Sequence, residues 1–96
     1  MTYANLQKAL RSLGLGDRAS QREIKARHRE LVKRHHPDTG YDGDPETIRK
    51  INDAYRIVCD YISAYRFSFA EDEFYEQNPE ERIWQQFADD PLWGKK

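Results

Sequence analysis

The residues best suited to chemistry stand at the end of a basic stretch of the 96-residue chain. His36, Pro37 and Asp38 follow the segment QREIKARHRELVKRH and precede the polar turn TGYDGD. Pro37 has no N–H and biases His36 away from helical geometry, so a helix entering from the basic stretch must end here. The rigid proline also fixes the direction of the chain and presents Asp38 at a defined place. An exposed carboxylate in a basic neighbourhood suits a charge-assisted bond to an arginine of another molecule.

Four cations are aligned on one flank of the helix expected to run into this tripeptide. With about 100° between successive residues, a helix over 21–35 has an apolar flank beside a basic flank. The first flank carries the apolar residues and two histidines: Ile24, His28, Leu31, Val32 and His35. The second carries Arg22, Lys25, Arg29 and Lys33. Such a row speeds and orients encounter with an acidic partner but adds little affinity per exposed pair, so we expect weak, salt-sensitive binding.

Metal binding and catalysis are the alternative uses of the histidines. His28 and His35 fall on the apolar flank, and His36 with Asp38 supplies too few ligands for a metal ion. The sequence has no Ser/His/Asp or Cys/His set with suitable spacing and no glycine-rich phosphate loop. Cys59, the only cysteine, is interpreted as a packing residue. We expect a protein that is not an enzyme and that needs no metal or cofactor.

The tripeptide is expected to be positioned by helices over about residues 3–13, 21–35 and 45–66. The first has Thr2 as a candidate N-cap, Gly14 as a stop and one apolar face, which consists of Leu6, Ala9, Leu10 and Leu13. The second begins with the capping-box pattern Ser20-Gln21-Arg22-Glu23. These signals fix where each helix starts and stops.

The third helix is expected to begin at Asp44 as N-cap with Pro45 at the first helical position. Apolar residues then recur three and four positions apart, at Ile48, Ile51, Tyr55, Val58, Ile62, Tyr65 and Phe69. This seam should pack antiparallel against the Ile24 and Leu31 face, with the first helix lying across the pair. The predicted fold class is therefore all-α: an antiparallel helical hairpin with a short N-terminal helix and one or two short C-terminal helices.

Residues 67–96 differ in composition from residues 1–66. The first 66 residues carry 13 Lys and Arg against 9 Asp and Glu, whereas the last 30 carry 3 against 8. Ser68 and Asn78-Pro79 are candidate helix starts, and Ile83, Trp84 and Phe87 fall on one side of the last helix. We interpret the aromatic residues as a small satellite core. A further hypothesis is that this acidic extension folds back over the third helix or the basic flank and modulates access.

The bulk composition is that of one globular domain. Hydrophobic residues make up 38% and charged residues 34% of the chain, and no apolar run approaches the about 20 residues that span a bilayer. The N-terminus lacks the pattern of a signal peptide, and a lone cysteine requires no oxidising compartment. We expect a cytoplasmic monomer that binds no membrane.

Residues 3–66 resemble a J-domain, the module of the DnaJ/Hsp40 co-chaperones. The segments LGLGDRAS, REIKARHRELVKRHHPD and IRKINDAYRIV carry the resemblance, with the His-Pro-Asp tripeptide between a basic helix and the Ala54-Tyr55 dipeptide. The resemblance implies a co-chaperone that binds an ATP-loaded Hsp70 and stimulates its ATPase. His36, Pro37 and Asp38 match the essential loop, Asp38 being the partner of an Hsp70 arginine. The basic flank and His28 complete the implied Hsp70-binding residues.

The sequence differs from the family pattern at four places. His28 stands where an exposed tyrosine is common, Glu30 replaces a basic residue, and Thr39 follows the tripeptide in place of Arg or Lys. The KFDRDG-like segment that is common after the third helix is missing. These differences predict an altered partner preference within the same fold.

Two other function classes remain open. A nucleic-acid-binding hairpin would use the six basic residues of the second helix, but the sequence pI is about 6.3 and no base-reading side chains are identifiable. An adaptor module would use the aromatic extension as its binding site. We rank both below the co-chaperone and expect no nucleic-acid partner.

Overall fold

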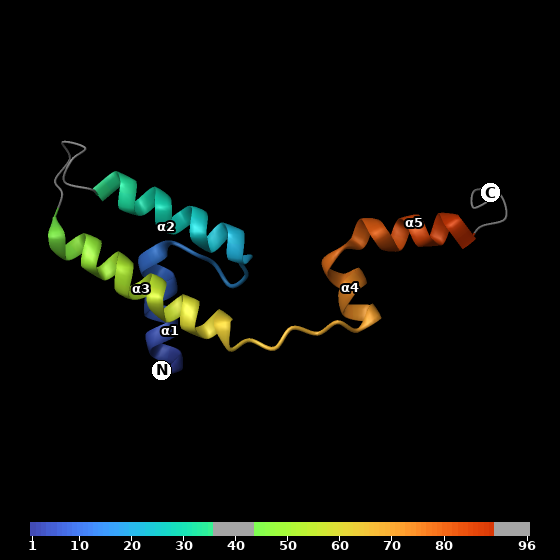
Figure 1. The fold of residues 1–96 in the computed structure, drawn as a ribbon, viewed down its shortest axis with the longest axis horizontal. Helices are drawn as coiled ribbons and strands as arrows, with labels where there is room; N and C mark the ends of the chain where they lie inside the picture. Colours follow the sequence, from blue (N-terminus) through green and yellow to red (C-terminus); the bar gives the residue numbers. More distant parts are fainter. Residues whose placement is uncertain (36–43, 90–96) are drawn as a thin grey trace. The chain divides into compact units, whose positions relative to one another are not determined.

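The computed structural model describes residues 1–35 and 44–89 and has five helices in them (Figure 1). They are α1 (Tyr3–Leu13), α2 (Gln21–His35), α3 (Pro45–Ser63), α4 (Glu71–Gln77) and α5 (Pro79–Asp89). These residues contain no strand, and the prediction of an all-α, J-domain-like fold is confirmed. None of the described helices is long and apolar enough to cross a membrane. The chain forms two compact units, residues 1–65 and residues 66–96.

Both ends of α1 are satisfied as its sequence predicts. The Thr2 hydroxyl accepts a hydrogen bond from the Asn5 N–H at 3.1 Å. At the other end Gly14 has a φ of 70° in the left-handed region, which glycine adopts at little cost. The Leu15 N–H donates to the Leu10 carbonyl at 2.9 Å and the Gly14 N–H to the Arg11 carbonyl at 3.1 Å. This pair of bonds is a Schellman motif and ends the helix.

Helix α2 starts with a complete capping box. The Glu23 N–H donates to the Ser20 hydroxyl at 3.1 Å, and the Ser20 N–H donates back to the Glu23 carboxylate at 2.6 Å. Two of the N–H groups that a helix start leaves unpaired are thereby satisfied. The bond from Ser20 lowers the pKa of Glu23 below its ordinary value of 4.5. The capping box therefore fixes the first residue of α2. The start of the helix in turn fixes the direction of its basic flank.

Helix α3 begins as expected but ends earlier than the predicted 45–66. The Asp44 carboxylate accepts from the Glu46 N–H at 3.1 Å, and Pro45 is the first helical residue. The helix stops at Ser63, whose hydroxyl donates to the Asp60 carbonyl at 2.9 Å. The Tyr65 N–H then bonds to the Ile62 carbonyl at 3.2 Å, a tighter turn than α-helix. Because the helix ends there, the last two positions of the predicted seam, Tyr65 and Phe69, lie outside it and are exposed.

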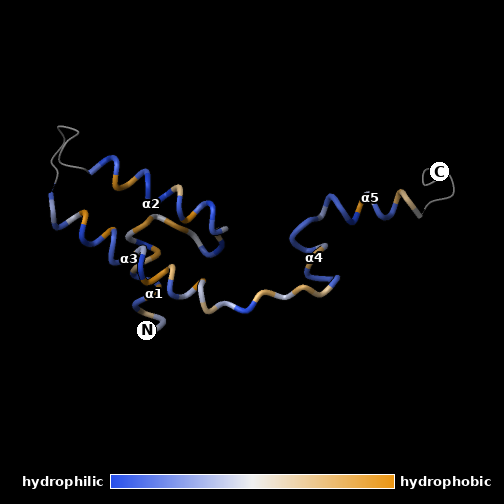
Figure 2. The backbone as a smooth tube through the Cα atoms, in the orientation of Figure 1, coloured by the Kyte–Doolittle hydropathy of each residue, from blue (hydrophilic) through white to orange (hydrophobic). Residues whose placement is uncertain are grey.

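The core of the described chain lies in residues 1–65, where α1 packs across the pair formed by α2 and α3 (Figure 1). Helix α2 is mostly hydrophilic with isolated hydrophobic positions along it (Figure 2). All the buried hydrophobic side chains of the described residues belong to these three helices: Ala9, Leu13, Ile24, Leu31, Ile51, Ala54 and Val58. Small side chains such as Ala9 and Ala54 permit close approach of helices at buried positions.

The described residues of the second unit form α4 and α5, and the expected satellite core is not found among residues 66–88. No residue between 66 and 88 is buried, and the side chains of Phe67, Phe69 and Trp84 are exposed. Ser68 is not the N-cap of α4, since its hydroxyl accepts from the Ala70 N–H at 3.2 Å and Ala70 occupies the cap position. The expected start of the last helix is correct, because α5 begins at Pro79 directly after Asn78.

Candidate functional site

The sequence places the candidate site at the C-terminal end of α2. The tripeptide His36-Pro37-Asp38 lies outside the described residues, so its role stays a prediction. The described part of the site is the surface of α2 that leads to it. This surface has three sides, which differ in charge and in partners.

The basic flank of α2 consists of Arg22, Lys25, Arg29 and Lys33. All four side chains are exposed. Within the part of the chain that the structure describes, none of the four forms an ion pair. Arg29 also lies near the Tyr55 phenol of α3. The basic flank is thus a row of exposed positive charges that can interact with another molecule. It lies on a helix whose first residue is fixed by the capping box.

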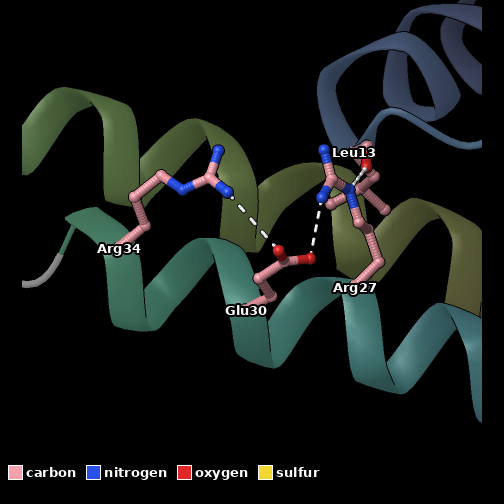
Figure 3. Close-up of polar contacts among 4 residues, drawn as sticks. All are labelled: Leu13, Arg27, Glu30 and Arg34. Carbon is pink, nitrogen blue, oxygen red and sulfur yellow. Dashed lines mark hydrogen bonds and ion pairs between the residues drawn. The ribbon is translucent and has the colours of Figure 1, made fainter.

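A second flank of α2 carries cations that are already paired (Figure 3). The Arg27 guanidinium donates through Nε to the Leu13 carbonyl at 2.7 Å and contacts the Glu30 carboxylate through Nη1 at 2.8 Å. Arg34 reaches the other Glu30 oxygen at 3.4 Å. Glu30 therefore lies between two arginines, and this flank has a much smaller surplus of charge than the first. Arg27 belongs to the packing of α1 against α2.

His28 lies on the side of α2 that faces α3. Its ring stacks on the Tyr55 ring with centroids 3.9 Å apart and planes 9° from parallel. Its Nε2 lies 2.9 Å from the Asn52 Oδ1. The histidine is half-buried and joins the two helices of the hairpin, apart from the row of four cations. A role in partner binding stays a prediction for this residue.

Tyr55 connects this contact to the rest of α3. A side-chain hydrogen bond with Cys59 raises the pKa of the Tyr55 phenol, and burial acts in the same direction, whereas the positive charge of Arg29 opposes them. The phenol therefore stays neutral at physiological pH. Cys59 is a free, half-buried cysteine, in keeping with its interpretation as a packing residue.

Sequence reasoning missed three parts of this arrangement. We did not anticipate that Asn52 contacts His28 or that Glu30 pairs with two arginines. Nor did we anticipate that Arg27 donates a hydrogen bond to the Leu13 carbonyl. The Glu30 pairs follow from spacing of three and four residues on one helix, so that signal was available. The other two depend on which residues of separate helices lie opposite one another. Among residues 1–35 and 44–89, no group of three or more His, Cys, Asp or Glu side chains could hold a metal ion.

With this geometry in view, comparison with known proteins gives a family. The model of the DnaJ domain matches residues 9–65, which is more than half of the chain. The chain belongs to the DnaJ-domain family. The matched range contains α2 and α3, the residues between them and the end of α1. The resemblance noted from the tripeptide and its flanks is confirmed.

Curated relatives match the same region of this DnaJ-domain chain. An uncharacterised 19.0 kDa protein of Sinorhizobium sp is 43% identical over 53 residues, which are 53% of this chain and 31% of that protein. The chaperone protein DnaJ of Ureaplasma parvum is 42% identical over 48 residues, 50% of this chain and 13% of that protein. A DnaJ-like protein of Mycoplasma pneumoniae is 39% identical over 66 residues, 62% of this chain and 21% of that protein.

The chain thus spans about a third or less of the length of these relatives. The similarity covers the DnaJ domain and does not extend to the remainder of the longer proteins. No solved structure matches the chain significantly.

Proposed function

We propose that this protein binds an ATP-bound Hsp70 through α2 and the His36-Pro37-Asp38 loop and stimulates its ATPase. The observation that carries the proposal is the row of Arg22, Lys25, Arg29 and Lys33, exposed and without ion pairs among the described residues. The row lies on the helix that leads into a His-Pro-Asp tripeptide in a DnaJ-domain chain. Two relatives bear the names of DnaJ and DnaJ-like proteins, which supports the same function.

In this proposal the row and the tripeptide have different tasks. The four cations attract and orient an acidic surface of the Hsp70, which raises the rate of association more than it raises the affinity. Asp38, presented by the rigid Pro37, forms a charge-assisted bond with an arginine of the partner. Binding is weak and falls as salt rises, because exposed charges are screened.

The proposed activity is regulatory. The protein performs no catalysis and needs no cofactor, because the ATP and Mg²⁺ belong to the Hsp70. It acts as a monomer, and a cytoplasmic location is part of the same proposal. Glu30, His28 and Thr39 are the positions where its preference among Hsp70 proteins should differ from that of other J-domains.

Asp38→Asn tests the proposed role of the loop. The change removes the negative charge with little change of shape, so the variant should stay folded but lose stimulation of Hsp70. The measurement is single-turnover hydrolysis of ATP preloaded on an Hsp70, with increasing concentrations of wild type or variant. Circular dichroism of both proteins controls for folding. A variant that is folded and stimulates as strongly as wild type would show that Asp38 is not the contact.

A further inference from the structure

Glu30 is the single acid of α2 beyond the first turn of the helix. The helix carries six basic side chains, and its other acid, Glu23, belongs to the capping box at its start. At about 100° per residue Glu30 falls between the row of four cations and the two arginines Arg27 and Arg34. It therefore lies at the edge of the surface that we propose for docking.

The two oxygens of the Glu30 carboxylate contact different arginines (Figure 3). Oε1 lies 2.8 Å from Nη1 of Arg27, whose Nε donates to the Leu13 carbonyl at 2.7 Å. Oε2 lies 3.4 Å from Nη2 of Arg34, about one turn further along α2. The first contact has a structural task, because it orients the guanidinium that joins α2 to the end of α1. The second contact joins no separate elements.

The contact between Glu30 and Arg34 affects charge more than stability. The side chains of Arg34 and Glu30 are 55% and 54% exposed, and an exposed pair at this spacing stabilises a helix only slightly. A guanidinium beside a carboxylate has almost no net charge as seen by another molecule. A partner's acid that approached Arg34 would also approach Glu30 and be repelled by it. Glu30 thereby withdraws Arg34 from the binding of acids.

We propose that Glu30 is a specificity-determining residue that confines the docking of an acidic partner to the row of four cations. An Hsp70 whose acidic residues face the row is attracted to α2. An Hsp70 whose acidic surface extends around the helix to Arg34 meets the Glu30 carboxylate and binds less well. This role of Glu30 rests on the proposed binding of an Hsp70 through α2, and it adds on which flank of the helix the partner's acids lie.

Glu30→Gln tests this role. The amide keeps the shape and can still accept a hydrogen bond from Arg27, but the charge that withdraws Arg34 is gone. In single-turnover hydrolysis of ATP on an Hsp70, we expect the variant to need about threefold less protein than wild type for half-maximal stimulation at low salt. Asp53→Asn is the matched control, because Asp53 pairs with Arg56 at 3.6 Å on α3, and it should behave as wild type. Circular dichroism checks that all variants are folded.

A second change at Arg34 separates the release of this arginine from a general change in charge. Arg34→Gln should have little effect in wild type but should abolish the gain in Glu30→Gln, a coupling that a double-mutant cycle measures. Glu30→Gln/Arg56→Gln has the same net charge as Glu30→Gln/Arg34→Gln and should keep the gain. Equal stimulation by Glu30→Gln and wild type would overturn the proposal and leave Glu30 with its structural task at Arg27. So would a gain that persists in Glu30→Gln/Arg34→Gln.

Failure of the proposed function would have a different signature. If wild type stimulates no Hsp70, the proposed function fails, and the role of Glu30 is decided with a labelled polyglutamate peptide. Fluorescence anisotropy of the peptide is measured against the concentration of the same variants at low salt. Binding of Glu30→Gln that is about threefold tighter than that of wild type, and that requires Arg34, would support the role of Glu30. Equal binding of the two proteins would overturn it.

Discussion

At Arg27 one side chain connects two helices of the first unit. Its guanidinium donates to the carbonyl of Leu13 at 2.7 Å, where α1 ends, and also pairs with Glu30. The bonds to Leu10 and Arg11 in the Schellman motif leave the Leu13 carbonyl unpaired, and Arg27 satisfies it. A basic residue of α2 therefore has a structural task, whereas Arg22 on the other flank has no ion pair among the described residues.

Replacing Arg27 with Gln should destabilise the protein. The part-buried Leu13 carbonyl loses a charge-assisted hydrogen bond, and the free energy of unfolding should fall by about 1 to 2 kcal/mol. Arg22→Gln is the matched control and should change it by less than about 0.5 kcal/mol. Urea unfolding followed by circular dichroism measures both. Equal stabilities of the two variants would contradict the assigned role of Arg27.

Gly14 is restricted by its backbone and by its surroundings. Its φ is 70°, and an added Cβ would lie 2.8 Å from Nη2 of Arg27. Gly14→Ala should therefore lower the free energy of unfolding by about 1 to 3 kcal/mol, since alanine is strained in this region and displaces the guanidinium. Gly16→Ala, in a position with nothing within 4 Å of the added carbon, should be close to neutral. Urea unfolding of both variants is the measurement, and a Gly14→Ala protein as stable as Gly16→Ala would be inconsistent with this reasoning.

The helix-capping roles of several residues were predictable from neighbouring residues in the sequence. Contacts between residues of separate helices were not. Thr2, Gly14, Ser20, Glu23 and Asp44 act where the sequence indicated, because each bonds to backbone within a few positions. His28 was expected beside the core, but its partners Asn52 and Tyr55 lie 24 and 27 positions further along the chain. Finding them requires knowing how α2 and α3 are aligned, and the apolar spacing of either helix alone does not contain that information.

At the scale of elements, α2 combines a fixed start with two unlike polar flanks. One flank has Arg27 and Arg34 on either side of Glu30, and the other has four cations without ion pairs among the described residues. The spacing of about 100° per residue predicted the basic flank of four cations, but it did not show that Arg27 and Arg34 on the other flank are paired with Glu30. For α3, the recurrence of apolar residues three and four positions apart predicted Tyr55 as a seam position. In the structure Ala54 is the buried residue, and Tyr55 is half-buried at the edge of the core.

The capping box of α2 should give stability a dependence on pH. The bond from the Ser20 N–H keeps the pKa of Glu23 below 4.5 in the folded protein. The stabilising contribution of the ionised Glu23 is therefore fully present above pH 4.5. It is lost as the pH falls through the lower pKa that Glu23 has in the folded protein. The Glu23→Gln variant should be less stable than wild type at neutral pH. Its free energy of unfolding should fall less steeply than that of wild type on acidification. Urea midpoints across the acidic range measure this, and parallel curves for the two proteins would refute it.

At the scale of the whole molecule, the chain separates a packed unit from an acidic one. Every buried hydrophobic side chain of the described residues lies in residues 1–65, the unit that contains the DnaJ-domain match over residues 9–65. The change in charge and composition predicted a boundary after residue 66. The contact between α4 and α5, in which Arg82 lies over the Tyr75 ring, was not predicted, because the amphipathic pattern of α5 indicated that its apolar side would be buried. The two units therefore differ: the first has a buried core and the basic row on α2, whereas no residue between 66 and 88 in the second is buried.

The most direct test of the central claim compares the two flanks of α2 in one assay. Single-turnover ATP hydrolysis by an Hsp70 is measured against concentrations of wild type, Lys25→Gln/Arg29→Gln and Arg34→Gln. We predict that wild type stimulates hydrolysis and that the double variant, equally folded, needs about tenfold more protein for half-maximal stimulation, while Arg34→Gln resembles wild type. A double variant that stimulates like wild type, or an Hsp70 panel that wild type does not stimulate, would contradict the account.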